Sequence, residues 1–294
     1  WDQSAASVKL KTLNDNPYVT FTAASEQTFK FSIPNDFTSS LGANEYFEYS
    51  VDGGDWTRFK TTVEDIHFGC NLGNLRLRGK SSKGTALNSD SGCSKIEFTT
   101  ENSPVDCTGD IRTLIDYENY ADVSTKDAMF RSLFSQNKEL KTAPVLPATT
   151  LAEACYTQMF GRCTALKTAP KLPAKTLAVG CYSEMFSGCT ALTKAPELPA
   201  ETLAPYCYQY MFKNCSALQS VRIKAKPVFD AQDEGNLSFQ IMEYANCFDG
   251  WLDGAGADNP KIYCYQEFYD FITVASKLEL TLCPGWSFYD IDNT

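Results

Sequence analysis

One pattern of 26 residues occurs three times without a gap between residues 140 and 217, and no other feature constrains the fold as strongly. The copies read LKTAPVLPATTLAEACYTQMFGRCTA, LKTAPKLPAKTLAVGCYSEMFSGCTA and LTKAPELPAETLAPYCYQYMFKNCSA, and 15 of the 26 positions are identical in all three. A fixed period of this length with leucine at its start is typical of leucine-rich solenoids. One copy has too little apolar surface for a core, so the copies are expected to stack.

The pattern extends weakly beyond the three copies. A fourth copy begins at Leu218 and soon diverges. A fainter copy precedes the first, because Phe130 and Phe134 lie one period before Tyr156 and Phe160. These flanking copies are expected to close the two ends of the array, since terminal units of a solenoid must cover its open core.

Comparison of the copies with one another separates interior from surface positions. The position that holds Val145, Lys171 and Glu197 in turn is predicted to face solvent, because an unpaired buried charge costs too much free energy. The invariant Leu, Ala, Cys, Met and Phe positions are predicted to be buried. Four more positions vary in the same way and are assigned to the surface: Lys141/Lys167/Thr193, Thr149/Lys175/Glu201, Glu153/Val179/Pro205 and Gln158/Glu184/Tyr210.

Each copy is expected to contain a strand and then a short helix. The first half, LKTAPVLP in copy one, is predicted to be extended, because its prolines exclude a helix and favour an edge or a turn. In the second half Leu151, Cys155 and Met159 lie four residues apart, which is helical spacing, and Thr150 could cap the helix.

The consensus L-P-A-x-T-L-A-x-x-C-Y-x-x-M-F-x-x-C-[TS]-A-L resembles the BspA-like leucine-rich repeats of surface proteins from Bacteroides and related gut and oral bacteria, over residues 107–225. The flanking segments YSVDGGDW and ANCFDGWLDG resemble the same proteins more loosely. The resemblance implies a protein exported to the cell surface, often as a lipoprotein, and in some members adhesion to host matrix proteins. It implies no ligand, because repeats of this kind specify a scaffold.

The flanks complete a predicted α+β fold. Residues 1–106 contain at least six short alternating strands with an Asp-Gly-Gly hairpin signal, which favours a β-sandwich-like domain. Residues 107–225 form the predicted leucine-rich-repeat solenoid. Residues 226–294 form an atypical C-terminal cap, for which we expect a helix between Phe239 and Leu252, a strand at KIYCY, a helix at EFYDFITVASKL and a final strand.

Charge and hydropathy exclude some classes of function. The formal net charge of −10 argues against general nucleic-acid binding, which needs a basic surface. No run of 18 apolar residues predicts a membrane span. The chain opens with the polar stretch WDQSAAS, without a signal-peptide pattern. If the protein is exported, its leader is expected to have been removed, and residues 1–7 are interpreted as the end of a tether.

The chain has twelve cysteines, and six of them belong to the repeat. We predict that these six are buried apolar residues, because two cysteines eight residues apart on a helix lie too far apart for a disulfide. Cys70 and Cys93 flank a Gly/Ser-rich loop and are the better disulfide candidates. The state of Cys107, Cys247, Cys264 and Cys283 is left open. No CxxC pair indicates zinc.

No constellation of catalytic residues stands out. His67, the one histidine, lies in the strand-like segment VEDIHF and is interpreted as an ordinary strand residue. The segment RGKS lacks the spacing of a phosphate-binding loop. We therefore predict a protein that is not an enzyme, with no cofactor and no metal site. A glycosidase would require two carboxylates placed across a cleft.

The remaining candidates are binding surfaces. Solenoids bind through the exposed side chains of successive strands, and here those side chains would form a basic surface for an anionic glycan or an acidic protein, or merely a solvated face. Tyr206 and Tyr210 could form an aromatic pair on one helix face, or could pack under the cap. A glycan-capture module through the N-terminal domain, with an exposed Trp56, is the alternative. The predicted strand-face residues are Lys141, Val145, Lys167, Lys171, Thr193, Lys194, Glu197, Gln219, Arg222 and Lys224.

Overall fold

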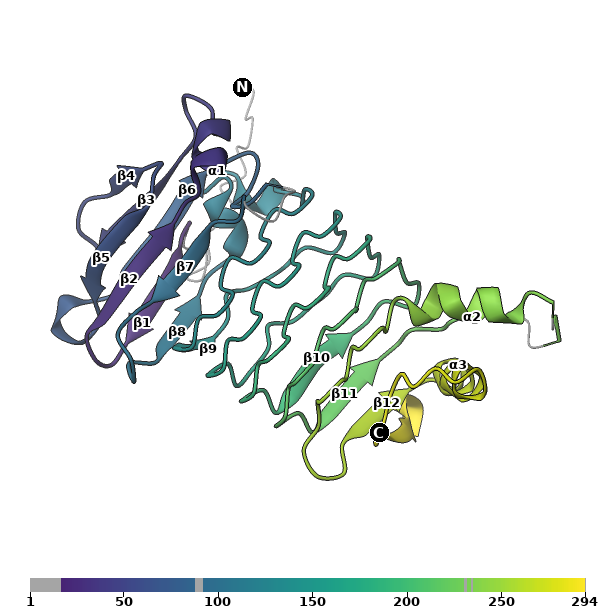
Figure 1. The fold of residues 1–294 in the computed structure, drawn as a ribbon. Coiled ribbons are helices and arrows are strands. Elements are labelled where there is room, and N and C mark those ends of the chain that lie inside the picture. Colours follow the sequence, from purple (N-terminus) through teal and green to yellow (C-terminus); the bar gives the residue numbers. More distant parts are fainter. Residues whose placement is uncertain (1–16, 88–91, 230–231, 234, 294) are drawn as a thin grey trace, which may run out of the picture.

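The structure is a computed structural model that describes residues 17–87, 92–229, 232–233 and 235–293. It is mostly β, with antiparallel strands in the N-terminal part, a row of similar units in the middle, and a parallel sheet with two helices in the C-terminal part (Figure 1). Residues 1–7, interpreted as a tether, lie outside the described residues.

Two sheets pack face to face in the N-terminal part. Every strand predicted between residues 18 and 99 is confirmed, and the YSVDGGDW hairpin joins β3 and β4 in antiparallel register. Alternate residues point inward, and the ring centroids of Phe31 and Phe47, on opposite sheets, lie 5.1 Å apart. One sheet has the order β4-β3-β6-β1-β8-β9 (Thr57–Phe59, Tyr46–Val51, Leu75–Lys80, Val19–Ala23, Val105–Thr108, Leu140–Thr142) and the other β5-β2-β7 (Val63–Phe68, Gln27–Ser32, Lys95–Phe98).

Short helical segments link these strands. The helix α1 (Asn35–Ser40) follows β2 and buries Phe37. The 3-10 turns η1 (Cys70–Leu72), η2 (Ile111–Leu114) and η3 (Tyr120–Asp122) lie farther along the chain.

Strand pairing passes from the N-terminal sheet into the repeats. The strands β8 and β9 are parallel, and single parallel bridges then join Thr142 to Thr168 and Thr168 to Lys194. The partners in these two bridges are one period of 26 residues apart. Successive units therefore lie side by side in register and in the same direction, as Figure 1 shows.

The short helix predicted in each unit is wrong. Residues 152–163 form consecutive turns, in which Met159 N donates to Tyr156 O within the unit and Phe160 N donates to Met185 O of the next unit. Every fourth residue has a left-handed backbone, with φ of 51° at Ala154 and 55° at Gln158. An α-helix directs its N–H groups to its own carbonyls, whereas this turn ladder shares alternate N–H groups with its neighbour.

The predicted interior and surface positions are confirmed in most cases. Met159, Met185 and the invariant Cys, Tyr and Phe residues are buried, whereas Val145 and its equivalents in the other units are exposed. Most of the invariant alanines are only half-buried, and so is the position Gln158/Glu184/Tyr210, which the comparison of copies assigns to the surface. Aromatic side chains stack from unit to unit, with 6.1 Å between the ring centroids of Tyr156 and Tyr182. Phe130 stacks on Tyr156 at 5.8 Å, as the fainter copy predicts.

The turn ladder continues beyond the three close copies. The predicted helix over residues 239–252 is too long, because α2 (Leu237–Ala245) ends before the segment CFDGWLDG at 247–254. There Tyr208 N donates to Cys247 O, as Tyr182 N donates to Cys207 O one unit earlier. Cys247 follows Cys207 by 40 residues, so 14 residues are inserted relative to the period.

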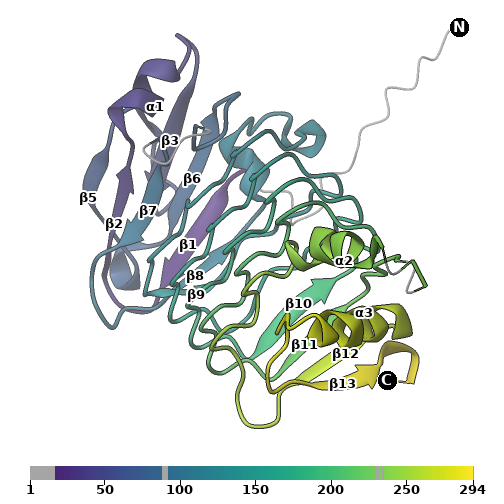
Figure 2. The same cartoon turned by 45° about the vertical axis from the view of Figure 1, so that its right-hand side comes forward.

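The C-terminal elements otherwise follow the prediction. The helix α3 (Gln266–Lys277) packs against α2, with 6.0 Å between the rings of Tyr244 and Phe271 (Figure 2). A short 3-10 turn, η4 (Ile291–Asn293), follows the last strand. The parallel sheet has the order β10-β11-β12-β13 (Lys194–Leu198, Ser220–Ile223, Lys261–Cys264, Ser287–Asp290).

No disulfide joins any two of the twelve cysteines, all of which lie in the described ranges. The prediction of a disulfide between Cys70 and Cys93 is therefore wrong. Cys70 is exposed in η1, whereas Cys93 pairs through its backbone with Ala86 beside β7. The six repeat cysteines are buried, as predicted.

Candidate functional site

Prolines interrupt strand pairing in the middle of each repeat unit. Parallel bridges join Thr142 to Thr168 and Thr150 to Thr176, and between these bridges the described residues of the two units form no further bridge. That interval contains Pro170 and its equivalents, which have no N–H to donate. The ladder between β10 and β11 likewise shifts register between Lys194 and Glu197.

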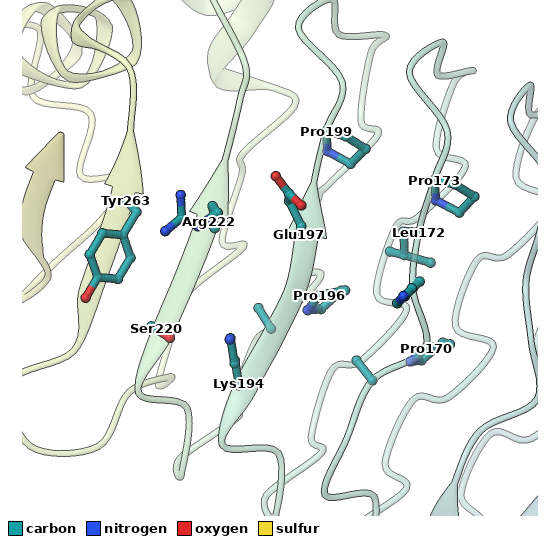
Figure 3. Close-up of a pocket in the computed structure, with 13 residues that line it drawn as sticks. Pro170, Leu172, Pro173, Lys194, Pro196, Glu197, Pro199, Ser220, Arg222 and Tyr263 are labelled. Atoms are coloured by element: carbon teal, nitrogen blue, oxygen red, sulfur yellow. The ribbon is translucent and has the colours of Figure 1, made fainter. Parts of the chain in front are cut away.

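A groove of about 690 Å³ lies where the pairing is interrupted. Figure 3 shows it crossing from the second close copy over β10 and β11 to Tyr263 on β12. Its lining contains four prolines and Leu172, and charged side chains stand among them. The prolines are Pro170, Pro173, Pro196 and Pro199.

Four predicted binding residues line this groove: Lys171, Lys194, Glu197 and Arg222. Lys224 is joined to them, because its ammonium lies 2.8 Å from the Glu197 carboxylate, and this hydrogen bond raises the pKa of Lys224.

Lys167 and Lys141 lie farther along the strand side. Lys167 is exposed one period before Thr193, and Lys141 lies 3.5 Å from the Asp106 carboxylate. Ten of the twelve predicted binding residues thus belong to the strand side of the units. Six of the ten are basic and one is acidic, although the whole chain carries a net charge of −10.

Tyr206 and Tyr210 do not join the groove. Both lie in the turn ladder with left-handed φ, so the shared helix face predicted for them does not exist. Tyr206 is 44% exposed. Tyr210 is half-buried against Gly250 of the next unit, and its hydroxyl donates to the Asp249 carboxylate, which raises the pKa of Tyr210. For Tyr210, packing against the C-terminal part is the better interpretation.

Sequence analysis missed Tyr263 and the prolines as groove residues. Tyr263 reaches the groove because β12 pairs with β11 in parallel, with Arg222 opposite Tyr263. The inserted residues before β12 hid this equivalence. The signal in the sequence was the strand-like segment KIYCY, in which alternate side chains point to the same face. In the structure Ile262 and Cys264 are buried, and Tyr263 between them is half-buried.

Trp56 does not offer an open ring face of the kind that glycan stacking needs. The Arg78 guanidinium lies 3.8 Å from the centre of the Trp56 ring and 4.0 Å from that of Tyr117. Arg78 in turn donates through Nε to the buried carboxylate of Glu48, which also accepts from Arg58 Nε, both at 2.7 Å. Trp56 is half-buried in this cluster, which braces the outer face of the sheet.

The remaining candidates for a catalytic or metal-binding role are His67 and the carboxylates. His67 is exposed and lies 3.0 Å from Glu26. Glu197 is the one carboxylate among the described residues that line the groove. Across the described ranges, no cluster of three His, Cys, Asp or Glu side chains could hold a metal ion. No helix in the same ranges is long and apolar enough to cross a membrane.

Comparisons of the chain with protein-family models, with curated proteins and with solved structures find no match in any of the three. The groove and the basic strand side are therefore interpreted from their own geometry.

Proposed function

We propose that this chain is a non-enzymatic cell-surface binding protein of the BspA-like leucine-rich-repeat class. In this proposal the stacked units form a solenoid over residues 107–225, between a sandwich domain over 1–106 and a capping region over 226–294. The protein is exported, and the strand side of the solenoid recognises a protein or glycoprotein on a host or neighbouring cell.

The groove is the observation that carries the proposal. Within each unit the invariant Met, Cys, Tyr and Phe residues are buried, and the position Val145/Lys171/Glu197, which varies in charge, is exposed on the strand side. Two of these variable residues, Lys171 and Glu197, line the groove. A constant core that presents variable side chains over a concave, partly apolar depression is suited to recognition of a partner.

A carbohydrate-capture module for glycan utilisation is the second candidate. The aromatic residue that supports this candidate is Tyr263, which borders the groove, and no longer Trp56. Aromatic residues in a depression lined by a few polar groups commonly orient ligands.

Binding to immobilised mucin and matrix glycoproteins tests the proposal. We expect the intact chain to bind at least one of these surfaces, and Lys171→Glu combined with Lys194→Glu to weaken binding at least tenfold. The matched control is Lys138→Glu with Lys277→Glu, which changes the net charge equally at two exposed positions outside the groove. Absence of binding to every surface, or equal loss in both double variants, would contradict the proposal.

A further inference from the structure

The groove presents backbone acceptors without the matching donors. No described N–H or side chain donates to the carbonyl oxygens of Pro170, Lys171, Leu172 or Pro173. The two prolines also supply no N–H to a ligand. The residues that line this part of the groove thus have carbonyl oxygens to which no described group donates, and their two prolines have no backbone N–H.

The charged side chains of the groove add the opposite chemistry. Lys171, Lys194 and Arg222 are cationic donors, and the one carboxylate of the lining, Glu197, is paired with Lys224 at 2.8 Å. The Arg222 guanidinium also lies 5.4 Å from the centre of the Tyr263 ring. The rim therefore favours a ligand that carries negative charge.

From this combination, and resting on the proposed function, we infer that the groove binds an acidic glycan, a carbohydrate chain bearing carboxylate or sulfate groups. Sugar hydroxyls donate to the backbone carbonyls of the groove, and the acidic groups accept from Lys171 and Lys194. These acidic groups also lie beside the positive charge of Arg222, whose Nη1 donates to Ile291 O. The prolines and Leu172 provide an apolar surface for the sugar rings.

The same features disfavour an acidic peptide. An extended peptide that binds alongside a strand exchanges both N–H and C=O groups with it. Next to Pro170 and Pro173 the carbonyl groups of such a peptide would find no backbone donor. Leaving buried polar groups unpaired costs about 1–3 kcal/mol for each group. A glycan has no such requirement, because its hydroxyls both donate and accept.

The test compares four probes on the intact chain: sialylated mucin, the same mucin after sialidase, a sulfated heparin oligosaccharide and a polyglutamate peptide. We expect saturable binding to sialylated mucin or to the heparin oligosaccharide, both of which carry acidic groups on a carbohydrate chain. Sialidase is expected to weaken mucin binding at least tenfold if carboxylate is the recognised group. Polyglutamate is expected to bind at least tenfold more weakly than the preferred glycan.

Two variants locate the site. Lys194→Gln is expected to weaken glycan binding at least fivefold, and Lys138→Gln, its control outside the groove, to leave binding unchanged. Pro170→Ala restores one backbone N–H without changing charge, so it is expected to improve polyglutamate binding relative to glycan binding.

The outcomes separate this inference from the proposed function. Mucin or matrix binding that is sensitive to Lys194→Gln but unaffected by sialidase, together with no binding to heparin, would overturn the inference and leave the proposed function standing. Stronger binding of polyglutamate than of either glycan would overturn it in the same way. Absence of binding to every glycoprotein surface and to heparin would overturn both.

Discussion

Single residues in the interior of the units have no room for polar substitutes. Met185 is fully buried in the middle close copy, and rings on both sides of its unit stack with their neighbours, such as Phe160 on Phe186 at 5.7 Å. A charge placed there would lie between two units without a partner. The six repeat cysteines are buried in the same way. Three of them also donate through Sγ to carbonyl oxygens of the preceding unit: Cys163, Cys189 and Cys215.

Met185→Asp is therefore expected to lower the free energy of unfolding by about 4 kcal/mol or more, because it buries an unpaired carboxylate. Chemical denaturation followed by far-UV circular dichroism measures the loss. Val179→Asp in the same unit is the control, since Val179 is 40% exposed, and it should change stability by less than about 1 kcal/mol. Similar stability of Met185→Asp and the parent chain would contradict the assignment of interior positions.

At the level of the element, the turn ladder is the feature that a pattern of apolar residues does not reveal. Leu151, Cys155 and Met159 lie four apart both in a helix and in a ribbon of turns with a left-handed residue every fourth position. What differs is the partner of alternate N–H groups, which depends on the neighbouring unit. The sequence therefore predicts which residues are buried, but not the backbone that buries them.

Glycine substitutions distinguish the two backbones. Glu184 has φ of 54°, so Glu184→Gly should leave stability unchanged or raise it by up to about 1 kcal/mol, because glycine adopts this conformation without strain. Ser183→Gly, at a neighbouring position outside the left-handed set, should cost about 1 kcal/mol. Thermal and denaturant unfolding measure both. Two equal losses, as a helix interior would give, would contradict the turn ladder.

The C-terminal units show a second limit of sequence reasoning. The segment CFDGWLDG repeats the spacing of CYxxMFxxC, and Gly250 and Gly254 occupy its left-handed positions. The inserted residues that carry α2 displace this copy from the period, so it is predicted as part of a helix. The groove was predictable only for residues inside the regular copies, because Tyr263 enters it across this insertion.

The stability of the molecule as a whole depends on buried cysteine thiols that stay protonated. Burial raises the pKa of Cys163, Cys181 and Cys215 to about 12 from the ordinary 9.0. The folded chain thus holds these protons more tightly than the unfolded chain. The stability linked to them is fully present below pH 9 and is lost as the pH rises from 9 toward 12.

Stability should consequently fall steeply above pH 9, by about 1.4 kcal/mol per pH unit for each such thiol. Denaturant midpoints measured between pH 7 and pH 10.5 in reducing buffer test this expectation. Cys70→Ser is the control, because Cys70 is exposed and its loss should leave the profile unchanged. A midpoint that stays constant up to pH 10.5 would show that the repeat thiols are not buried in solution.

The whole array also depends on its two ends, since stacked units expose apolar surface wherever the stack stops. At the N-terminal end Phe21 of β1 contacts Phe134, with 6.3 Å between ring centroids. At the other end Trp251 follows Phe212 at 6.5 Å and packs against Phe268 of α3. Strand pairs and single bridges form one continuous series from β4 to β13. Both ends are therefore joined to the repeats through backbone pairing.

Trp251→Ala should accordingly destabilise the repeats as well as the C-terminal helices. We expect a loss of about 3–5 kcal/mol, because a fully buried tryptophan is removed. With Trp1 and Trp56 replaced by Phe in both proteins, tryptophan fluorescence reports on the C-terminal part, and its transition should coincide with the transition followed by circular dichroism, as in the parent chain. Tyr269→Ala on the exposed side of α3 is the control and should cost less than about 1 kcal/mol. Separation of the two transitions would mean that the C-terminal part unfolds alone, and that the repeats remain stacked without Trp251 at their end.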